Sequence, residues 1–162
     1  MSMFESRPDD VAGIAFINSG SRPAGEKERE ISAKSMAAAE RDFERFMANI
    51  AKLGLHPAHE AEPAYAAFQL PMMRETGLSG YLAQQRAVLE RPDPRSLLNG
   101  FSKRACIVCS VGDRVTPKPL SDELKAMLPQ AAFHVVENAG HWTPLEVPEA
   151  VSAAILGLIS QG

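Results

Sequence analysis

Cysteine is scarce in this chain, which has two thiols among 162 residues. Two cysteines build no disulfide framework, so the cytoplasm is the simplest predicted location. No apolar run approaches the roughly 20 residues of a membrane-spanning helix, so no membrane partner is expected. The N-terminal MSMFESRPDD has no apolar stretch after a basic start, so the sequence predicts no secretory signal.

The chain also lacks a large excess of charge of either sign. The chain has 17 Lys and Arg against 20 Asp and Glu, a net charge of −3, and the two signs are interspersed. A nucleic-acid surface normally needs a basic face, so no nucleic-acid partner is expected. Aromatic residues make up only 6% of the chain, but apolar residues make up 45%, which is enough for a buried core. Composition and length together predict one globular domain.

Three nearly continuous apolar segments are predicted to be short buried strands. They are residues 11–17, 105–111 and 132–136. Runs of this length suit parallel strands that are covered on both faces. Amphipathic helices are predicted at 117–128, with Thr116 as the N-cap, and at 147–159. The alternation of strand and helix predicts an α/β fold with a doubly wound, mostly parallel sheet.

The segment between the first two strands has helical patterns instead. One long helix is predicted at 24–53, and two more at 60–75 and 79–90. The predicted division within a single domain is a first-strand region at 1–19, a helical insertion at 20–95, and a C-terminal strand–helix–strand–helix unit at 96–162.

An acid and a base follow the second and third predicted strands. Asp113 comes directly after the strand that ends in Ser-Val-Gly, and His141 lies in the Ala-Gly-His turn after the next strand. The carboxyl ends of parallel strands meet at the edge where ligands bind, so we expect Asp113 to lie within hydrogen-bond reach of His141. A buried carboxylate there would fix the imidazole tautomer and stabilise its protonated form. The structural alternative for both residues is that they simply shape their turns.

The motifs around these two residues resemble the C-terminal signature of the α/β-hydrolase superfamily. IVCSVGDRVTP is similar to the acid strand and loop, and LPQAAFHVVENAGHWTPLEVPEAV is similar to the base strand, the A-G-H turn and the E-x-P-E start of the last helix. Here the acid follows its glycine immediately, whereas many members have one or two residues between them. RPDDVAGIAFINSG and QQRAVLERPDPRSLL resemble the family's earlier segments, so the resemblance covers nearly the whole chain.

The resemblance implies a fold and a chemistry. The fold would be the C-terminal part of an α/β-hydrolase, with residues 20–95 as its helical lid. The reaction would be hydrolysis of small esters, lactones or carbon–carbon bonds beside a ketone, without cofactor or metal. His141 would act as the general base, and Asp113 would orient it. Trp142 directly follows the base and either lines the substrate pocket or packs beneath the loop.

The family's nucleophile is the part of the triad that the sequence is predicted to lack. Its elbow, G-x-S-x-G, does not occur in the chain. The nearest imitation, around Ser79, follows no predicted strand, while Ser19 and Ser21 lie in a turn. The oxyanion-hole loop, which normally comes earlier still, is also missing, so the chain alone is predicted to be inactive.

Three hypotheses account for this pattern. In the first, the chain is the truncated part of a hydrolase whose first half lies outside the given sequence. In the second, it is a non-catalytic remnant that serves as a binding module or a homo-oligomer paired through an open sheet edge. In the third, a separate chain supplies the elbow. The DNA upstream of Met1 discriminates the first from the third.

Two other patterns favour structural roles. Cys106 and Cys109 form C-x-x-C within a predicted strand, where residues three apart point to opposite faces, so both are expected to be buried and unbridged. His56, His59 and Glu60 match no metal motif with a known mechanism, so no metal site is expected.

Overall fold

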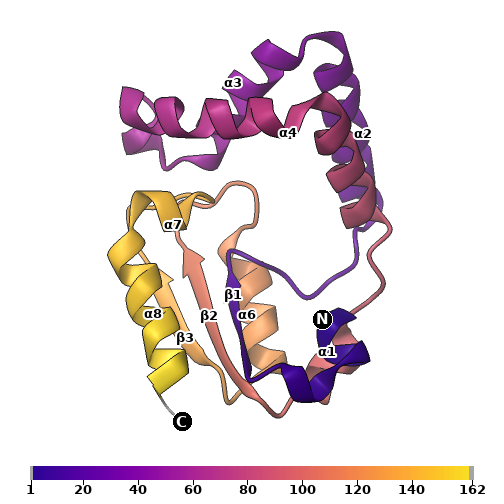
Figure 1. Ribbon diagram of the computed structural model, residues 1–162, viewed down its shortest axis with the longest axis vertical. Coiled ribbons are helices and arrows are strands. Elements are labelled where there is room, and N and C mark those ends of the chain that lie inside the picture. Colours follow the sequence, from indigo (N-terminus) through magenta and orange to yellow (C-terminus); the bar gives the residue numbers. More distant parts are fainter. Residues whose placement is uncertain (1, 161–162) are drawn as a thin grey trace.

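The computed structural model describes residues 2–160 and consists of a small sheet with its flanking helices, beneath a layer of longer helices (Figure 1). The strands are β1 (Gly13–Ile17), β2 (Arg104–Ser110) and β3 (Ala132–Val136). The α-helices are α1 (Ser2–Ser6), α2 (Glu26–Arg41), α3 (Phe43–Gly54), α4 (Pro63–Leu89), α5 (Arg95–Asn99), α6 (Lys118–Met127), α7 (Thr143–Glu146) and α8 (Pro148–Ser160). Two short 3₁₀ turns, Pro8–Asp10 and Pro57–His59, complete the described elements.

The sheet is parallel and has the strand order β1-β2-β3. Gly13 is opposite Arg104 in one ladder, and Cys106 is opposite Ala132 in the other. Helices α6 and α8 pack against β2 and cover opposite faces of the sheet, while the strands point toward the upper helices (Figure 1). This arrangement confirms the predicted α/β class and matches the C-terminal part of a doubly wound parallel sheet.

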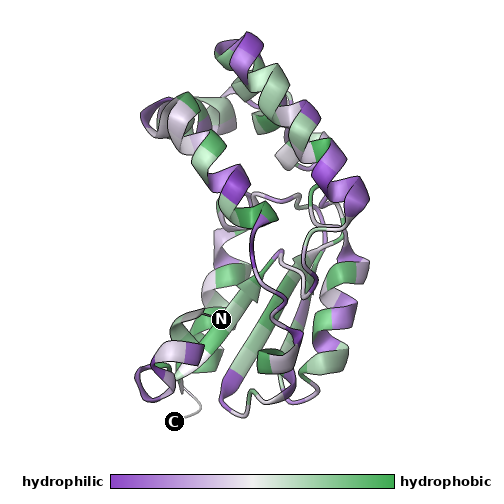
Figure 2. Cartoon of the chain, turned by 90° about the vertical axis from the view of Figure 1, so that its right-hand side faces the viewer, coloured by the Kyte–Doolittle hydropathy of each residue, from purple (hydrophilic) through white to green (hydrophobic). Residues whose placement is uncertain are grey.

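The core lies on both faces of β2. Ile107 is fully buried in a cluster that includes Leu124 of α6, and its neighbour Val108 is fully buried in a second cluster with Val151 of α8. Consecutive strand residues point to opposite faces, so the pair shows directly that β2 is covered on both sides. Figure 2 shows the same pattern as green, hydrophobic strands between helices.

Burial of all three strands on both faces was predicted, and for β3 this is wrong. Ala132, His134 and Val135 are exposed in β3. β3 forms one edge of the sheet, where helix cover is thinner than over the central strand β2. The apolar sequence of β3 therefore does not indicate whether helices cover one or both of its faces.

Helices α2, α3 and α4, which we call the lid helices because they form the segment predicted to be a lid, differ from the predicted pattern in one break. The predicted single helix at 24–53 is wrong: α2 ends at Arg41, and Asp42 begins α3 by accepting a hydrogen bond from the Arg45 amide at 3.1 Å. The helices predicted at 60–75 and 79–90 correspond to the two segments of α4, which meet at a kink at Gly77 with φ 66° and ψ 173°. Essentially only glycine adopts that conformation, so Gly77 fixes the bend.

The start of α6 also differs from expectation. Thr116 was predicted to cap this helix, but Pro117 occupies the N-cap position, without a side-chain cap. The amide of Thr116 donates instead to Asp113 Oδ1 at 2.8 Å. In this turn Thr116 therefore bonds to the acid Asp113 and does not cap α6. In residues 2–160, no helix is both long and apolar enough to cross a membrane.

Candidate active site

Asp113 and His141 contact each other at the carboxyl ends of β2 and β3. His141 Nδ1 lies 2.9 Å from Asp113 Oδ2, which confirms the predicted pairing. The Asp113 side chain is 0% exposed, whereas the His141 side chain is 38% exposed. A carboxylate only accepts, so Nδ1 carries the hydrogen and Nε2, on the far side of the ring, is left to take a proton.

The acid loop aims Asp113 at the imidazole. Asp113 Oδ1 accepts from the Val115 amide at 2.7 Å and from the Thr116 amide at 2.8 Å. These two bonds orient the carboxylate and leave Oδ2 for His141. The Thr116 hydroxyl lies 3.4 Å from the same ring nitrogen. The short Gly-Asp loop therefore reaches the base without any loop movement.

A buried asparagine supports the base loop from the end of β1. Asn18 Nδ2 donates to the carbonyls of Gly140 and His141 at 3.0 and 3.1 Å and to the Thr143 hydroxyl at 2.6 Å. Asn18 Oδ1 accepts from the Ser110 amide at 3.0 Å. One side chain thus links the ends of all three strands. The sequence analysis missed Asn18, although an Asn that follows a strand and precedes Ser-Gly is a signal for a special backbone conformation.

Glu146 is a second residue that the sequence analysis did not single out. Its carboxylate accepts from the Gly140 amide and the His56 amide, each at 2.7 Å, and from His59 Nδ1 at 2.8 Å. The Glu146 side chain is fully buried. It joins the base loop to residues 54–60, which we call the lid root because they connect α3 to α4.

The lid root approaches the base loop so closely that glycine is required. A Cβ on Gly140 would overlap the Gly54 carbonyl and the His56 amide, and a Cβ on Gly54 would overlap the Trp142 indole. The Trp142 amide donates to the Gly54 carbonyl at 3.1 Å. The glycine of the A-G-H turn is therefore explained by backbone contact with the lid.

Replacing Glu146 should loosen this junction. We expect Glu146→Ala to lower the free energy of unfolding by on the order of 3 kcal/mol, because buried donors on Gly140 and His56 lose their acceptor. Urea unfolding measures the loss, and hydrogen exchange should show faster exchange at those two amides. Glu149→Ala is the matched control, since Glu149 is exposed at the start of α8 and its loss should cost less than about 0.5 kcal/mol. Equal losses in the two variants would contradict the assignment.

Trp142 lies between the base and a cavity in the lid. The cavity has a volume of about 330 Å³ and is bounded by α3, α4 and the Trp142 side chain. Phe46 and Met47 line it from α3, and Met73 and Tyr81 line it from α4. The sequence left open whether Trp142 lines a pocket or packs beneath the loop. In the structure Trp142 does both, because its side chain lines the cavity and its indole packs against Gly54 of the lid root.

Solved structures share the fold of this chain. An esterase from Thermogutta terrifontis superposes with a TM-score of 0.85 at 23% identity, over 99% of this chain and 60% of that one. An enzyme from a Medee basin deep-sea metagenome library, described as an α/β-hydrolase, has a TM-score of 0.85 at 17% identity, with the same coverage. The enol-lactonase from Burkholderia xenovorans LB400 has a TM-score of 0.84 at 17% identity, over 98% of this chain and 60% of that one.

This chain has the α/β-hydrolase fold. No protein-family profile and no curated protein sequence matches it. The likeness therefore rests on three-dimensional structure, and the chain spans about 60% of the length of these α/β-hydrolase structures.

The three serines considered as nucleophiles lie in surroundings other than a strand-to-helix elbow. Ser79 is exposed within α4 of the lid, and Ser21 is buried after β1. Ser19 contributes its carbonyl as an acceptor for the Ser121 hydroxyl at 3.2 Å. None of these three follows a strand in an elbow turn that leads directly into a helix.

The cysteines and the lid-root histidines have structural surroundings. Cys106 and Cys109 are buried and unbridged within β2, as predicted, and burial raises the pKa of both thiols. Three positions apart on one strand, they face opposite sides of the sheet. His59 pairs with Glu146, as described, and the His56 ring accepts from the Ala58 amide at 3.2 Å. Among residues 2–160, no group of three or more His, Cys, Asp or Glu side chains is placed to hold a metal ion.

Proposed function

We propose that this chain supplies the acid and the base of an α/β-hydrolase catalytic triad, with Asp113 as the acid and His141 as the base. The observation that carries the proposal is the 2.9 Å contact between a fully buried carboxylate and an accessible imidazole. The contact lies at the carboxyl edge of a parallel sheet, which is where α/β folds bind ligands. The lid cavity beside Trp142 supplies space for a small substrate next to this pair.

In the proposed reaction, His141 Nε2 takes the proton of a nucleophile and later returns it to the leaving group. Asp113 holds the ring through Nδ1 and stabilises the imidazolium that forms. The substrates proposed are small esters, lactones or carbon–carbon bonds beside a ketone. The names of two structural neighbours, an esterase and an enol-lactonase, support the ester and lactone classes.

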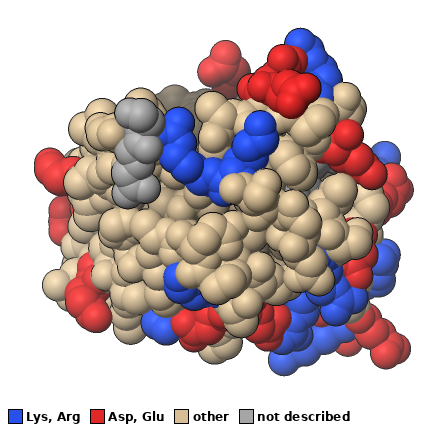
Figure 3. Space-filling model, turned by 90° about the horizontal axis from the view of Figure 1, so that it is seen from below, with Lys and Arg blue, Asp and Glu red and all other residues tan. Residues whose placement is uncertain are grey.

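We further propose that the nucleophile comes from a segment outside residues 2–160, either of the same protein or of a separate chain. Within the described part of the chain, β1 pairs only with β2, so its other edge is free for one more strand. A cavity of about 340 Å³ lies at the foot of this edge, lined in part by Val11, Gly13 and Leu158. Seen from below, where the strands begin, the molecule shows a largely uncharged central area, with most charged side chains toward its margin (Figure 3).

The proposal is tested by supplying the nucleophile. The DNA upstream of Met1 is read for a segment with G-x-S-x-G, in frame or in a neighbouring reading frame, and that segment is produced together with this chain. We expect turnover of p-nitrophenyl acetate by the assembly and none above the His141→Ala background by residues 1–162 alone. Light scattering should show self-association of the lone chain through the open β1 edge. Clear His141-dependent turnover by the lone chain would refute the external nucleophile, and an inactive assembly would refute the triad.

A further inference from the structure

The contact between Asp113 and His141 lies between two loops that share one support, the lid root. One bond joins the acid loop directly to the base loop, since the Gly112 amide donates to the Ala139 carbonyl at 3.1 Å. Each loop is also attached to the lid root by one charged side chain. The geometry of the acid–base pair therefore depends on both attachments.

Arg114 attaches the acid loop to the end of α3 and to the lid root. Its Nη2 lies 3.0 Å from the carbonyl oxygens of Lys52 and Leu55 and 2.6 Å from the carboxylate of Glu60. The last carbonyls of a helix have no donor within the helix, so a guanidinium there gives them a partner and interacts favourably with the helix dipole. Because Arg114 directly follows Asp113, this attachment also restrains the acid.

Glu146 attaches the base loop to the neighbouring residue of the lid root. Its buried carboxylate accepts from the Gly140 amide at 2.7 Å and from His59 Nδ1 at 2.8 Å. Gly140 directly precedes His141, so the carboxylate holds the backbone next to the base. His59 and Glu60 are consecutive in the sequence. Two adjacent side chains thus hold the two loops, one through an acidic partner and the other through a basic partner.

His56 packs between these two attachments. Its ring lies against Gly112, where a Cβ would come within 2.4 Å of the ring, and its amide donates to Glu146 at 2.7 Å. The rings of His56 and His59 have centroids 5.6 Å apart, and His59 packs on Tyr65 of α4 at 5.4 Å. The glycine before the acid is therefore explained by contact with the lid root, as is the glycine before the base.

We propose that residues 56–60 of the lid root are a brace that sets the spacing of the acid and base loops, with His59 and Glu60 as positioning residues for the acid–base pair. The inference rests on the proposed hydrolase function and gives a role to an H-x-x-H-E pattern that matches no metal motif. His59 acts on the base through Glu146, and Glu60 acts on the acid through Arg114. Loss of either contact lets one loop move relative to the other, which slows proton transfer without removing a contact to substrate.

The first test observes the acid–base pair without turnover. In residues 1–162 with isotopically labelled histidine, NMR follows the Nδ1 hydrogen that joins His141 to Asp113, and His141→Ala identifies its signal by loss. We expect this hydrogen to exchange with water at least roughly fivefold faster in Glu60→Ala and in His59→Phe, because the loops then separate more often. Exchange as slow as in the parent chain, in either variant, would overturn the assignment of that residue.

Variants of His59 separate hydrogen bonding from packing. His59→Phe keeps a ring beside Tyr65 but removes the donor to Glu146, whereas His59→Asn places an amide donor where Nδ1 was. We expect the asparagine variant to exchange within about twofold of the parent chain, because it keeps the bond to Glu146. Fast exchange in both variants would show that the ring acts by packing alone, and His59 would not be a positioning residue.

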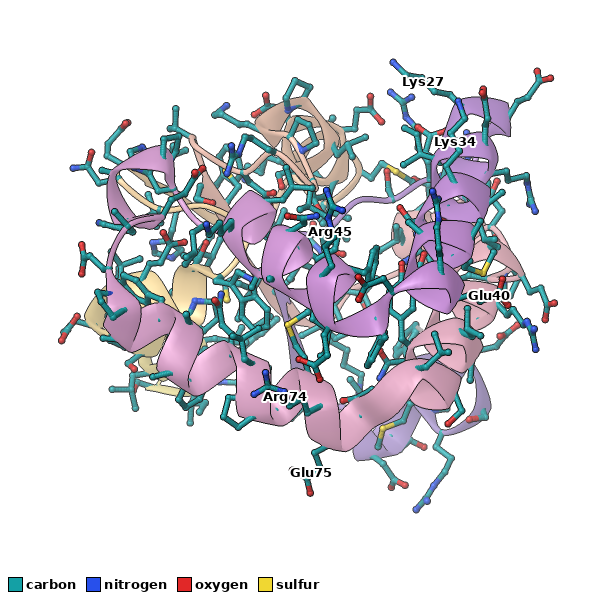
Figure 4. All side chains as sticks on the ribbon, turned by 90° about the horizontal axis from the view of Figure 1, so that it is seen from above. Lys27, Lys34, Glu40, Arg45, Arg74 and Glu75 are labelled. Atoms are coloured by element: carbon teal, nitrogen blue, oxygen red, sulfur yellow. The ribbon has the colours of Figure 1, made fainter. Side chains whose placement is uncertain are left out.

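A second pair of variants tests whether Glu60 acts through Arg114. In an Arg114→Ala background, Glu60→Ala should change the exchange rate by less than about twofold, because its partner is already gone. A further acceleration there would contradict the proposed route. Glu44→Ala is the matched control and should change exchange by less than about twofold, since Glu44 pairs with exposed Arg74 of α4 rather than with a triad loop. In Figure 4 Arg74 lies on α4 beside Glu75, which points away from α3.

The second test measures turnover by the elbow-complemented hydrolase. We expect kcat to fall by roughly tenfold in Glu60→Ala and in His59→Phe, with KM within about twofold of the parent, because the variants disturb the acid–base pair rather than the lid cavity. A rise of KM as large as the fall of kcat would show that the lid itself had moved, and would overturn the brace.

Exchange and turnover separate the two proposals. Faster exchange in the brace variants, together with an inactive complemented parent, would sink the proposed function and leave the brace intact. His141-dependent turnover by the parent, with kcat unchanged in both brace variants, would do the reverse.

Discussion

Asp113→Asn will lower kcat of the elbow-complemented hydrolase by on the order of 10⁴, and His141→Ala will lower it by on the order of 10⁶. In the asparagine variant, Oδ1 continues to accept from the amides of Val115 and Thr116, so the side chain keeps its orientation. Its NH₂ group then faces His141 Nδ1, where an acceptor is required. The imidazole is held in the wrong tautomer, with its hydrogen on Nε2, and cannot take the proton of the nucleophile.

The effect should fall on kcat with little change in KM, because neither residue is placed to hold the ground-state substrate in the lid cavity. Asp122→Asn is the control, since Asp122 is exposed and pairs with Lys118 on the surface. The double variant Asp113→Asn/His141→Ala should be no slower than His141→Ala alone, because a triad acts as a unit. Additive losses, or an Asp113→Asn variant within tenfold of the parent, would show that Asp113 does not serve the base.

The parts of the fold that the sequence predicted are those with a local physical signal. The apolar run of β2 lies between two turns, so its burial followed from its composition, and its limits were predicted to within one residue, at 105–111 for a strand at 104–110. Asp113 and His141 could be brought together because parallel strands place their carboxyl ends at one edge. Both the burial of β2 and the pairing of Asp113 with His141 could therefore be predicted from short segments of the sequence.

The residues that the sequence missed depend on contacts between distant segments. Glu146 meets His56 across 90 positions, and Asn18 meets Thr143 across 125. The residues next to Glu146 and Asn18 in the sequence do not indicate that either side chain is buried or that it has three or more hydrogen-bond partners. The break at Asp42 was missed for a related reason, since helical composition continues through it while a single residue changes the direction of the chain.

Asn18→Ala will lower the free energy of unfolding by on the order of 4 kcal/mol, the largest loss expected for a single substitution of a polar residue in this chain. Asn18, directly after β1, is 5% exposed, and its side chain bonds to the end of β2 and to the base loop after β3. Alanine removes the acceptor of the buried Ser110 amide and the amide donor of the His141 carbonyl, while the Gly140 carbonyl keeps the Ser110 and Thr143 hydroxyls as donors. Alanine also keeps the residue at φ 43°, a left-handed conformation that Asn tolerates better than Ala.

Variants of Asn138 separate the cost of the lost hydrogen bonds from the cost of the left-handed backbone conformation. It has φ 53° in the turn after β3, but it is exposed. Asn138→Ala should therefore cost only the backbone preference, about 1 kcal/mol, and Asn138→Gly should cost nothing measurable. Asn18→Gly removes the backbone preference but not the loss of hydrogen bonds, so it should remain destabilised by on the order of 3 kcal/mol. Urea unfolding followed by circular dichroism measures all four variants. If Asn18→Gly were as stable as the parent chain, Asn18 would be no more than a turn residue, and the base loop would be held by its other contacts, among them Glu146, Ser110 and Thr143.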